Sequence, residues 1–228
     1  MESGVIEVPD QVAPGSDTAA WRRRRVAILL FDDVEVLDFA GPFEVFGVAK
    51  TPAGEAAFEV VTVAIEPGEI IARNELRILP TFTAADFGIV DILVVPGGFG
   101  TRREMTSPEM LSFLRTASRS ADLVLSVCTG ALMLGAAGLL RGQAATTHWA
   151  AMGELRAIDS GAKILPDARI IDNGRLIVSA GVSAGIDAAL YIVERLLGRA
   201  QADATARAME YVWTCADTEG AIVVRAND

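Results

Sequence analysis

The sequence predicts a doubly wound α/β fold, in which a largely parallel sheet is covered by helices on both faces. Short continuous apolar runs, such as 26–31, 92–95 and 123–127, are typical of strands buried on both faces. Segments with apolar residues at helical spacing alternate with these runs, which favours parallel strands joined by helices. The 228 residues, 51% of them hydrophobic, suffice for one domain with a large core.

Each element follows from its local pattern. Apolar or β-branched runs predict strands at 26–31, 58–65, 76–79, 92–95, 123–127, 144–147, 169–171 and 176–178. Apolar residues at helical spacing predict helices at 37–49, 108–120, 131–137, 149–158, 183–197 and 202–213.

Turn and cap residues set several of the boundaries. Ser107 and Pro108 are typical of the N-cap and the first position of a helix. Pro42 is placed in the first turn of the helix at 37–49 for the same reason. The sequence Asp-Asn-Gly at 172–174 predicts a hairpin between its two flanking strands.

The ends of the chain differ in composition from its middle. Residues 1–24, with a Pro-Gly-Ser-Asp stretch, predict a disordered or loosely docked extension. Residues 25–213 are expected to form the α/β domain, and residues 214–228 a C-terminal tail. The start lacks the basic and apolar regions of a signal peptide.

Composition excludes several classes of function. The net charge of −10 and the pI of about 4.7 argue against nucleic-acid binding. Charged and turn residues interrupt every apolar run, so no membrane span is expected. Cys128 and Cys215 make no disulfide framework, and this favours a cytoplasmic location.

Cys128 stands between the strand at 123–127 and the small-residue helix at 131–137. That switch from strand to helix is the geometry of a nucleophile elbow, a strained turn that presents a side chain above the sheet edge. A helix N-terminus at this point is expected to lower the pKa of the thiol and to offer N–H groups to an anion. The alternative is a buried, inert core cysteine.

Three candidate positions come directly after predicted parallel strands. Asp38 follows the first strand, Gly97 and Gly98 follow the strand at 92–95, and Cys128 follows the strand at 123–127. Ligands of doubly wound sheets bind beyond the carboxyl ends of the strands, so these residues are expected to meet at one site.

These residues resemble the ThiJ/PfpI superfamily, and within it the isonitrile hydratase branch, over residues 25–213. The matching stretches are LDFAGP (37–42), VPGG (95–98), SVCTG (126–130), LGAAGLL (134–140), ATTHW (145–149) and SAGID (183–187). The resemblance implies a flavodoxin-like sandwich, similar to class I glutamine amidotransferases, with a cysteine on the elbow. It also implies a homodimer that acts on a small molecule without a metal or an organic cofactor.

In such a hydratase, Cys128 attacks the terminal carbon of an isonitrile to give a thioimidate. Asp38 matches the acidic residue that hydratases place beside the cysteine, where it would supply a proton and later act as the base for water. Thr129 would orient water or substrate, and its N–H would help to bind an anion. Gly98, with Gly97, would offer a second N–H, because glycine allows close approach of the backbone.

Each role has a structural alternative. Asp38 or Thr129 would instead cap a helix, and the two glycines would only form a tight turn. Glu44 is a second carboxylate near the same edge, with a solvated position as the favoured interpretation.

Three further residues are candidates for support of the site. His148 is the only histidine, and a supporting or helix-start role is favoured for it over a catalytic one. Ser183 and Asp187 form a turn into a helix that would shape the pocket or bind an anion, although a dipole interaction of Asp187 is favoured. One histidine and two distant cysteines argue against a metal site.

Other functions stay open. Cys128 beside a carboxyl also fits a redox sensor, and the same motifs occur in the ligand-sensing half of AraC-type regulators. Those regulators carry a C-terminal helix-turn-helix domain, for which a chain that ends at Asp228 leaves no room. A glyoxalase-like reaction on small carbonyl compounds would need a second acid or a histidine beside Cys128, for which Glu44 and His148 are available.

Overall fold

The computed structural model describes residues 21–158, 161–213 and 223–225. Its centre is a sheet in the order β12-β10-β11-β7-β6-β1-β2-β5. The strands of this sheet are β1 (Arg24–Leu29), β2 (Phe58–Ala64), β5 (Phe82–Thr83), β6 (Ile92–Val95), β7 (Leu123–Val127), β10 (Ile170–Asp172), β11 (Leu176–Ser179) and β12 (Val223–Arg225). Neighbouring strands are parallel except β10 and β11, which form an antiparallel pair.

Two small two-stranded sheets and a set of helices complete the fold. The small sheets pair β3 (Ile70–Ile71) with β4 (Arg77–Ile78), and β8 (Ala144–Ala145) with β9 (Lys163–Ile164). The α-helices are α1 (Val36–Val48), α2 (Thr101–Glu104), α3 (Pro108–Ser120), α4 (Gly130–Ala136), α5 (Met152–Ala157), α6 (Ala184–Leu197) and α7 (Arg199–Ala208). Two 3₁₀ turns are η1 (Arg73–Glu75) and η2 (Trp149–Ala151).

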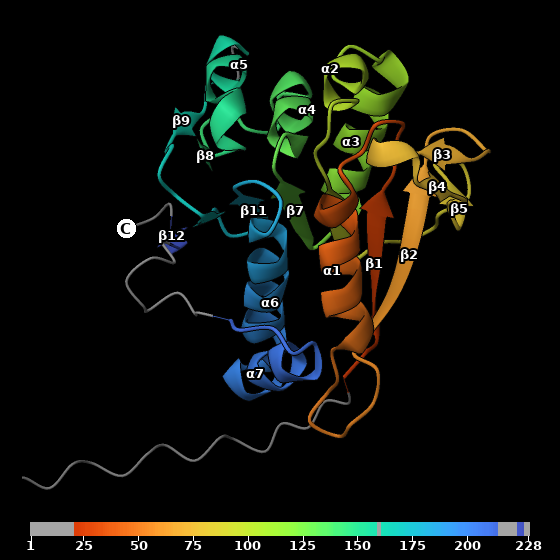
Figure 1. Cartoon of the computed structure of the whole chain (residues 1–228), viewed down its shortest axis with the longest axis vertical. Coiled ribbons are helices and arrows are strands. Elements are labelled where there is room, and N and C mark those ends of the chain that lie inside the picture. Colours follow the sequence, from red (N-terminus) through yellow and green to blue (C-terminus); the bar gives the residue numbers. More distant parts are fainter. Residues whose placement is uncertain (1–20, 159–160, 214–222, 226–228) are drawn as a thin grey trace, which may run out of the picture.

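The strand order places the helices on both faces of the sheet. The crossover β1–α1–β2 moves toward one edge, and the crossover β6–α3–β7 moves toward the other. Because such crossovers are right-handed, α1 and α3 lie on opposite faces. Helices α1 and α6 pack side by side on one face (Figure 1). The predicted doubly wound, flavodoxin-like α/β fold is therefore confirmed.

Most predicted elements are present within one or two residues of their expected bounds. Ser107 caps α3, since its Oγ accepts a hydrogen bond from the N–H of Met110 at 3.2 Å. The predicted hairpin joins β10 to β11, and the N–H of Gly174 donates to Asp172 Oδ1 at 2.7 Å in its turn.

Two details of the helix predictions are wrong. Pro42 lies in the interior of α1, because the helix begins at Val36 and already includes Asp38 in its first turn. The last predicted helix, 202–213, is found as α7, which begins three residues earlier and ends five residues earlier. It starts directly after Gly198, whose φ of 89° ends the helical conformation of α6. Beyond its C-terminal end, Glu210 has a left-handed φ of 53°.

The four consecutive arginines join the first strand to its surroundings. Arg22 pairs with Asp91, Arg24 with Asp122 and Arg25 with Glu59, and Arg23 Nε donates to the carbonyl of Phe58 at 3.1 Å. Trp21 Nε1 donates to the carbonyl of Ala57 at 3.0 Å, so the chain is docked from its first described residue. The structure does not describe the rest of the predicted N-terminal extension. Cys215 and most of the predicted C-terminal tail also lie outside the described residues.

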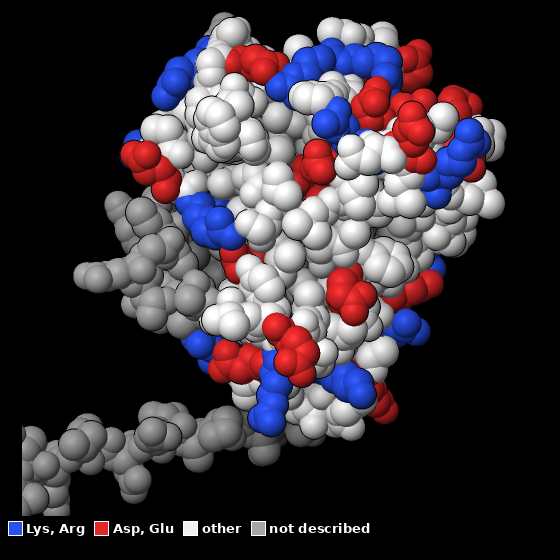
Figure 2. Space-filling model, viewed as in Figure 1, with Lys and Arg blue, Asp and Glu red and all other residues white. Residues whose placement is uncertain are grey.

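The core is centred on the middle of the sheet. Strands β6 and β7 are buried along their whole length, as are Val26 to Leu29 of β1. Within the described ranges, none of the helices has the length and apolar character to cross a bilayer. The middle of the face that carries α1 and α6 is largely uncharged, whereas charges gather at its upper and lower ends (Figure 2).

Gly130, at the start of α4, is required by close packing against β6. A Cβ at this position would lie 2.2 Å from the carbonyl oxygen of Val95. Gly130→Ala is therefore expected to lower the free energy of unfolding by about 3 kcal/mol. Gly47→Ala in α1 is the matched control, because no atom lies within 4 Å of its new Cβ. It is expected to raise the free energy of unfolding by up to about 1 kcal/mol. Urea denaturation of both variants measures this, and an unchanged midpoint for Gly130→Ala would contradict the packing.

Candidate active site

Cys128 lies on a sharp turn between β7 and α4. Its φ is 57°, a left-handed conformation that is uncommon for a residue with a side chain. The N–H of Cys128 donates to the carbonyls of Ser179 and Ala180 at 3.3 and 3.1 Å, and its own carbonyl accepts a hydrogen bond from Thr147 Oγ1 at 2.7 Å. The elbow geometry expected from the sequence is present, and neighbouring segments hold it on both sides.

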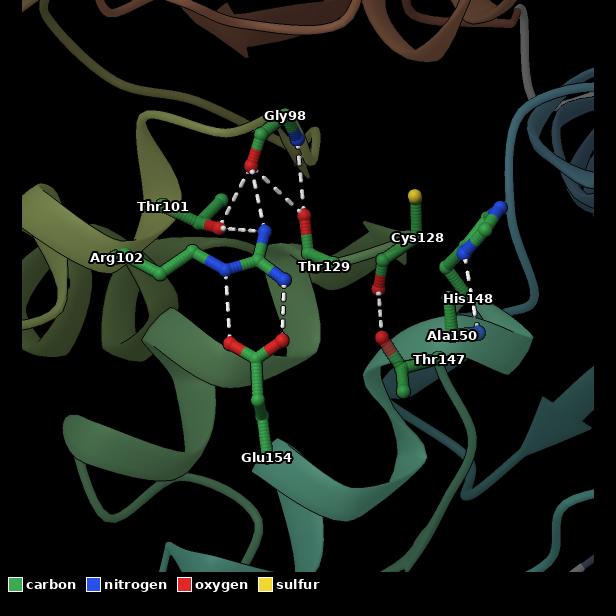
Figure 3. A network of polar contacts seen from close by, with 9 residues as sticks. All are labelled: Gly98, Thr101, Arg102, Cys128, Thr129, Thr147, His148, Ala150 and Glu154. Carbon is green, nitrogen blue, oxygen red and sulfur yellow. Dashed lines mark hydrogen bonds and ion pairs between the residues drawn. The ribbon is translucent and has the colours of Figure 1, made fainter.

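A cavity of about 320 Å³ opens at this turn. Its lining comes from the loops beyond the carboxyl ends of the strands: Glu35, Gly98, Phe99, Arg102, Cys128, Thr129, His148, Ala150, Ala151 and Val182. The thiol of Cys128 points upward between Thr129 and His148 (Figure 3). Cys128 is 6% exposed, so little of this residue is accessible to a small molecule in the cavity.

Asp38 lies in the first turn of α1 and has no exposed surface. Its Oδ2 accepts the N–H of Gly97 at 3.0 Å. Among the described residues Oδ1 has no hydrogen-bond partner of ordinary geometry, although the Cys128 thiol acts on the carboxyl as a weak sulfur donor. The expected meeting of Asp38 and Cys128 is thus found, with Asp38 buried rather than in the lining of the cavity.

Burial dominates the titration of Asp38 and raises its pKa to about 7. The Cys128 thiol and the N–H groups of Gly97 and Val182 favour the carboxylate and oppose this rise, and the charge of Glu35 adds to it. At neutral pH the carboxyl therefore exchanges a proton readily, which suits a group that moves protons in a reaction.

The expected low pKa of Cys128 is wrong. Burial, followed by the charge of Asp38, raises the pKa of the thiol to about 12, and the N–H groups of Thr129 and Val182 oppose this without outweighing it. Above pH 7 the pair thus holds one proton, which resides on the sulfur while Asp38 is a carboxylate. The thiolate forms only as Asp38 takes that proton.

Thr129 occupies the N-cap of α4, but its side chain makes no capping hydrogen bond. Its Oγ1 accepts the N–H of Gly98 at 2.9 Å and donates to the carbonyl of Gly98 at 3.1 Å. The hydroxyl hydrogen is therefore engaged and does not point at a substrate, contrary to the expectation from the sequence. The N–H of Thr129, in contrast, acts on the sulfur.

Gly97 and Gly98 hold the site together and do not offer free N–H groups to an anion. The N–H of Gly97 is bonded to Asp38, and that of Gly98 to Thr129. A Cβ on Gly97 would lie 2.6 Å from Thr129 Oγ1 and 2.8 Å from Asp38 Oδ2. Glycine is thus required at position 97 because two functional side chains converge on its backbone.

His148 combines the helix-start role that was favoured for it with a place in the cavity wall. Its Nδ1 accepts the N–H of Ala150 at 3.2 Å at the start of η2. In the neutral ring the proton is then on Nε2, so the ring is a donor and not a base. Since no carboxylate in the described part of the chain pairs with it, His148 does not form a triad with Cys128.

The other expected residues lie away from the cavity. Asp187 forms an ion pair with Arg169 and accepts a hydrogen bond from Tyr211 Oη at 2.9 Å. Ser183 accepts a hydrogen bond from Arg169 at 3.3 Å, so both residues support the turn that precedes α6. Glu44 is exposed on α1 and is not part of the lining.

The structure adds residues that the sequence did not indicate. Val182, a β-branched residue at φ 53°, has its N–H near both Cys128 and Asp38. Arg102 donates to the Gly98 carbonyl at 3.2 Å and forms a double hydrogen bond with Glu154 at 2.8 and 2.6 Å (Figure 3). Glu35 precedes Asp38 by one helical turn, a spacing that was available in the sequence.

The set of donor atoms at the site does not suit a metal ion. Within the described ranges, His, Cys, Asp and Glu side chains form no group of three or more that could hold a metal. The site consists of one thiol, one buried carboxyl and backbone N–H groups. These groups suit proton transfer and attack by sulfur on a small electrophile.

The profile of the DJ-1/PfpI family matches residues 24–195 of the chain. An isonitrile hydratase of Pseudomonas putida is 37% identical over 187 residues, which cover 82% of this chain and 78% of that protein. The HTH-type transcriptional regulator GbdR of Pseudomonas aeruginosa is 27% identical over 82% of this chain, which spans half the length of the regulator.

The same similarity extends to solved structures. A THiJ/PfpI family protein from Pseudomonas syringae has a TM-score of 0.75 and 30% sequence identity to this chain. The match covers 92% of this chain and 83% of that one.

Proposed function

The chain belongs to the DJ-1/PfpI family, and we propose that it is an enzyme that adds water to isonitriles to give N-substituted formamides. The observation that carries this proposal is the Cys128 thiol, which faces a 320 Å³ cavity and has the buried carboxyl of Asp38 behind it. The 37% identity to an isonitrile hydratase supports the same chemistry.

The first half of the reaction forms a covalent adduct. The sulfur of Cys128 bonds to the terminal carbon of R–N≡C as its proton moves to the Asp38 carboxylate. One π pair of the triple bond becomes a lone pair on the nitrogen, and the lone pair that the terminal carbon already carries takes the proton from Asp38. The product is a thioimidate, R–N=CH–S–Cys128, and the N–H groups of Thr129 and Val182 stabilise the sulfur while it carries negative charge.

The second half consumes water. A water oxygen bonds to the thioimidate carbon, and protons are redistributed so that the nitrogen becomes N–H. The C–S bond then breaks, which releases R–NH–CHO and restores the thiol. Isonitrile and one water are consumed for each formamide, and no step calls for a metal or an organic cofactor.

Two observations argue against the other candidate enzymes and sensors. Burial and the charge of Asp38 raise the pKa of Cys128 to about 12, which disfavours the reactive thiolate of a redox sensor. His148 Nδ1 is engaged by a backbone N–H, which disfavours a glyoxalase-like reaction that uses a histidine base. Sensing of a small ligand without turnover remains a rival, and the match to a transcriptional regulator supports it. A glyoxalase-like reaction that uses a second acid remains another, because the carboxylate of Glu35 lies in the cavity lining with Cys128.

Turnover of an aryl isonitrile tests the proposal. The wild-type protein is expected to produce formamide, followed by its absorbance, and Cys128→Ala is expected to lose at least 1,000-fold, roughly as nucleophile removal does in other enzymes. Cys215→Ala, which removes the chain's other cysteine, is the control and is expected to keep turnover. Binding of isonitriles without formamide production by the wild type would reject the hydratase and favour the ligand sensor.

The homodimer and the cytoplasmic location remain predictions of the family resemblance and of composition. Leu37 and Phe43 are exposed apolar side chains on α1, and they are compatible with a dimer contact on that helix.

A further inference from the structure

We infer that Glu35 is a second catalytic carboxylate, which activates the water in the second half of the reaction, while Asp38 serves the sulfur. This inference rests on the proposed hydratase function. It replaces the interpretation from the sequence, in which Asp38 served both halves.

The burial of Asp38 is the first reason. Asp38 has no exposed surface and is absent from the cavity lining, whereas the thioimidate carbon lies on the cavity side of the sulfur. Water reaches that carbon from the cavity. Asp38 Oδ2 is also occupied by the N–H of Gly97. Asp38 is therefore well placed for the thiol proton and poorly placed for an incoming water.

The position of Glu35 is the second reason. Glu35 is the carboxylate in the cavity lining, and its side chain is 31% exposed. Its backbone is fixed by the hydrogen bond from its N–H to the carbonyl of Gly97 at 2.9 Å. A carboxylate that lines the cavity on a fixed backbone is accessible to a water that enters the cavity, and a general base must meet that water.

The contacts of Glu35 leave its oxygens available. Glu35 Oε2 is 3.7 Å from Arg73 Nε, which is an ion pair but not a hydrogen bond. The guanidinium of Arg73 stacks on Phe99 at 3.9 Å. In the described part of the chain no side chain donates a hydrogen bond to the Glu35 carboxylate. A water in the cavity can occupy those free acceptor positions.

The other polar side chains of the lining do not compete for this role. Arg102 is engaged by Glu154 and by the Gly98 carbonyl. His148 carries its neutral-state proton on Nε2 and is therefore a donor. The Thr129 hydroxyl is engaged by Gly98. Glu35 is thus the group of the lining that has free acceptor capacity and negative charge.

The proton balance with Glu35 is complete. As the water oxygen bonds to the thioimidate carbon, one water proton passes to Glu35, and Glu35 delivers it to the thioimidate nitrogen. This gives R–NH–CH(OH)–S–Cys128. The hydroxyl then loses its proton to Glu35 as the C–S bond breaks, and Glu35 passes that proton to the released sulfur, which also meets the cavity. Both carboxylates end as they began, and one water has been consumed.

Adduct formation separates the two carboxylates experimentally. At pH 8 Glu35→Gln is expected to form the Cys128 adduct, seen by intact-protein mass spectrometry, at a rate within about threefold of wild type. Asp38 and Cys128 keep their side chains, and loss of the Glu35 charge lowers the pKa of a carboxyl that is already ionised at this pH. The variant's steady-state formamide production is expected to fall about 100-fold, the usual size of a general-base contribution. Adduct should therefore accumulate in Glu35→Gln and not in the wild type. Glu44→Gln, which changes an exposed carboxylate of α1 outside the cavity lining, is the control and is expected to behave as wild type.

Each outcome decides the question. Wild-type turnover by Glu35→Gln, or slow turnover without accumulated adduct, would overturn the role of Glu35 and leave the hydratase standing. If the wild type makes no formamide and no adduct, the proposed function fails and the inference fails with it. Glu35→Asp keeps a carboxylate and is expected to restore part of the turnover, which a loss of folding in Glu35→Gln would not explain.

Discussion

Asp38→Asn is expected to abolish turnover and, above pH 7, to make the protein more stable. Asparagine keeps the shape of the side chain and an oxygen for the Gly97 N–H, but it has no carboxylate to accept the thiol proton. We expect turnover to fall by about 1,000-fold or more, as loss of an acid–base group does. Formamide production and urea denaturation of the same preparation measure the two effects.

The sign of the stability effect follows from the raised pKa of Asp38. Burial raises it from 3.8 to about 7, so the folded state keeps its proton when the unfolded state has lost it. Stability from this group is fully present below about pH 4 and is lost as pH rises to 7, where ionisation of the buried carboxyl has cost about 4 kcal/mol. The free energy of unfolding of Asp38→Asn is therefore expected to exceed that of the wild type by about 4 kcal/mol at pH 8 and to differ little from it near pH 4.

Asp91 provides a matched control of opposite sign. Its side chain is 7% exposed, and although burial raises its pKa, the Arg22 guanidinium and the N–H of Arg25 outweigh burial and lower it. Asp91 thus contributes stability above the unfolded pKa, and Asp91→Asn is expected to destabilise the protein at pH 8. A loss of stability in Asp38→Asn at pH 8 would show that Asp38 is a structural residue and not a strained functional one.

The pH profile of turnover is expected to show an acid limb near pH 7. The reactive pair needs Asp38 as the carboxylate that receives the thiol proton, and Asp38 becomes protonated below its pKa of about 7. The ratio kcat/KM should therefore fall about tenfold per pH unit below 7, or roughly 100-fold at pH 5 relative to the plateau. The plateau should persist well above pH 8, because the pKa of Cys128 is raised to about 12.

Profiles measured between pH 5 and 9 with an aryl isonitrile test this expectation. Glu44→Gln should retain the acid limb, since Glu44 lies outside the cavity lining. A rate that rises from pH 8 to 9 would instead indicate that free thiolate is the reactive form. A flat profile would remove Asp38 from the proton transfer.

The sequence predicts the fold well because its signals are local. Continuous apolar runs mark β1, β6 and β7, and Ser107 with Pro108 marks the start of α3. The prediction fails where local signals compete, as at Pro42, which suits a first helical turn but lies inside α1. Gly198 ends α6, and α7 begins at the next residue. The spacing of apolar residues alone does not reveal where this second helix starts.

The candidate site was predicted in part. The rule that ligands meet the carboxyl ends of parallel strands brought Asp38 and Cys128 together. The pKa of Cys128 was expected in the wrong direction, because burial and the charge of Asp38 are properties of the assembled core and not of the turn. Val182 was missed since no residue type signals that a valine will adopt φ 53°. Ser183 and Asp187 match the family motif, yet both contact Arg169 and support the turn before α6.

The strand order also has a consequence for how activity arises during folding. Asp38 and Cys128 are far apart along the chain, and they meet only because β1, β6 and β7 are neighbours in the sheet. Contacts of such long sequence separation form slowly, since a large loop must close before they yield any stabilisation. Regain of turnover after dilution from denaturant thus reports the assembly of the central strands, whereas helical signal returns earlier from the local segments.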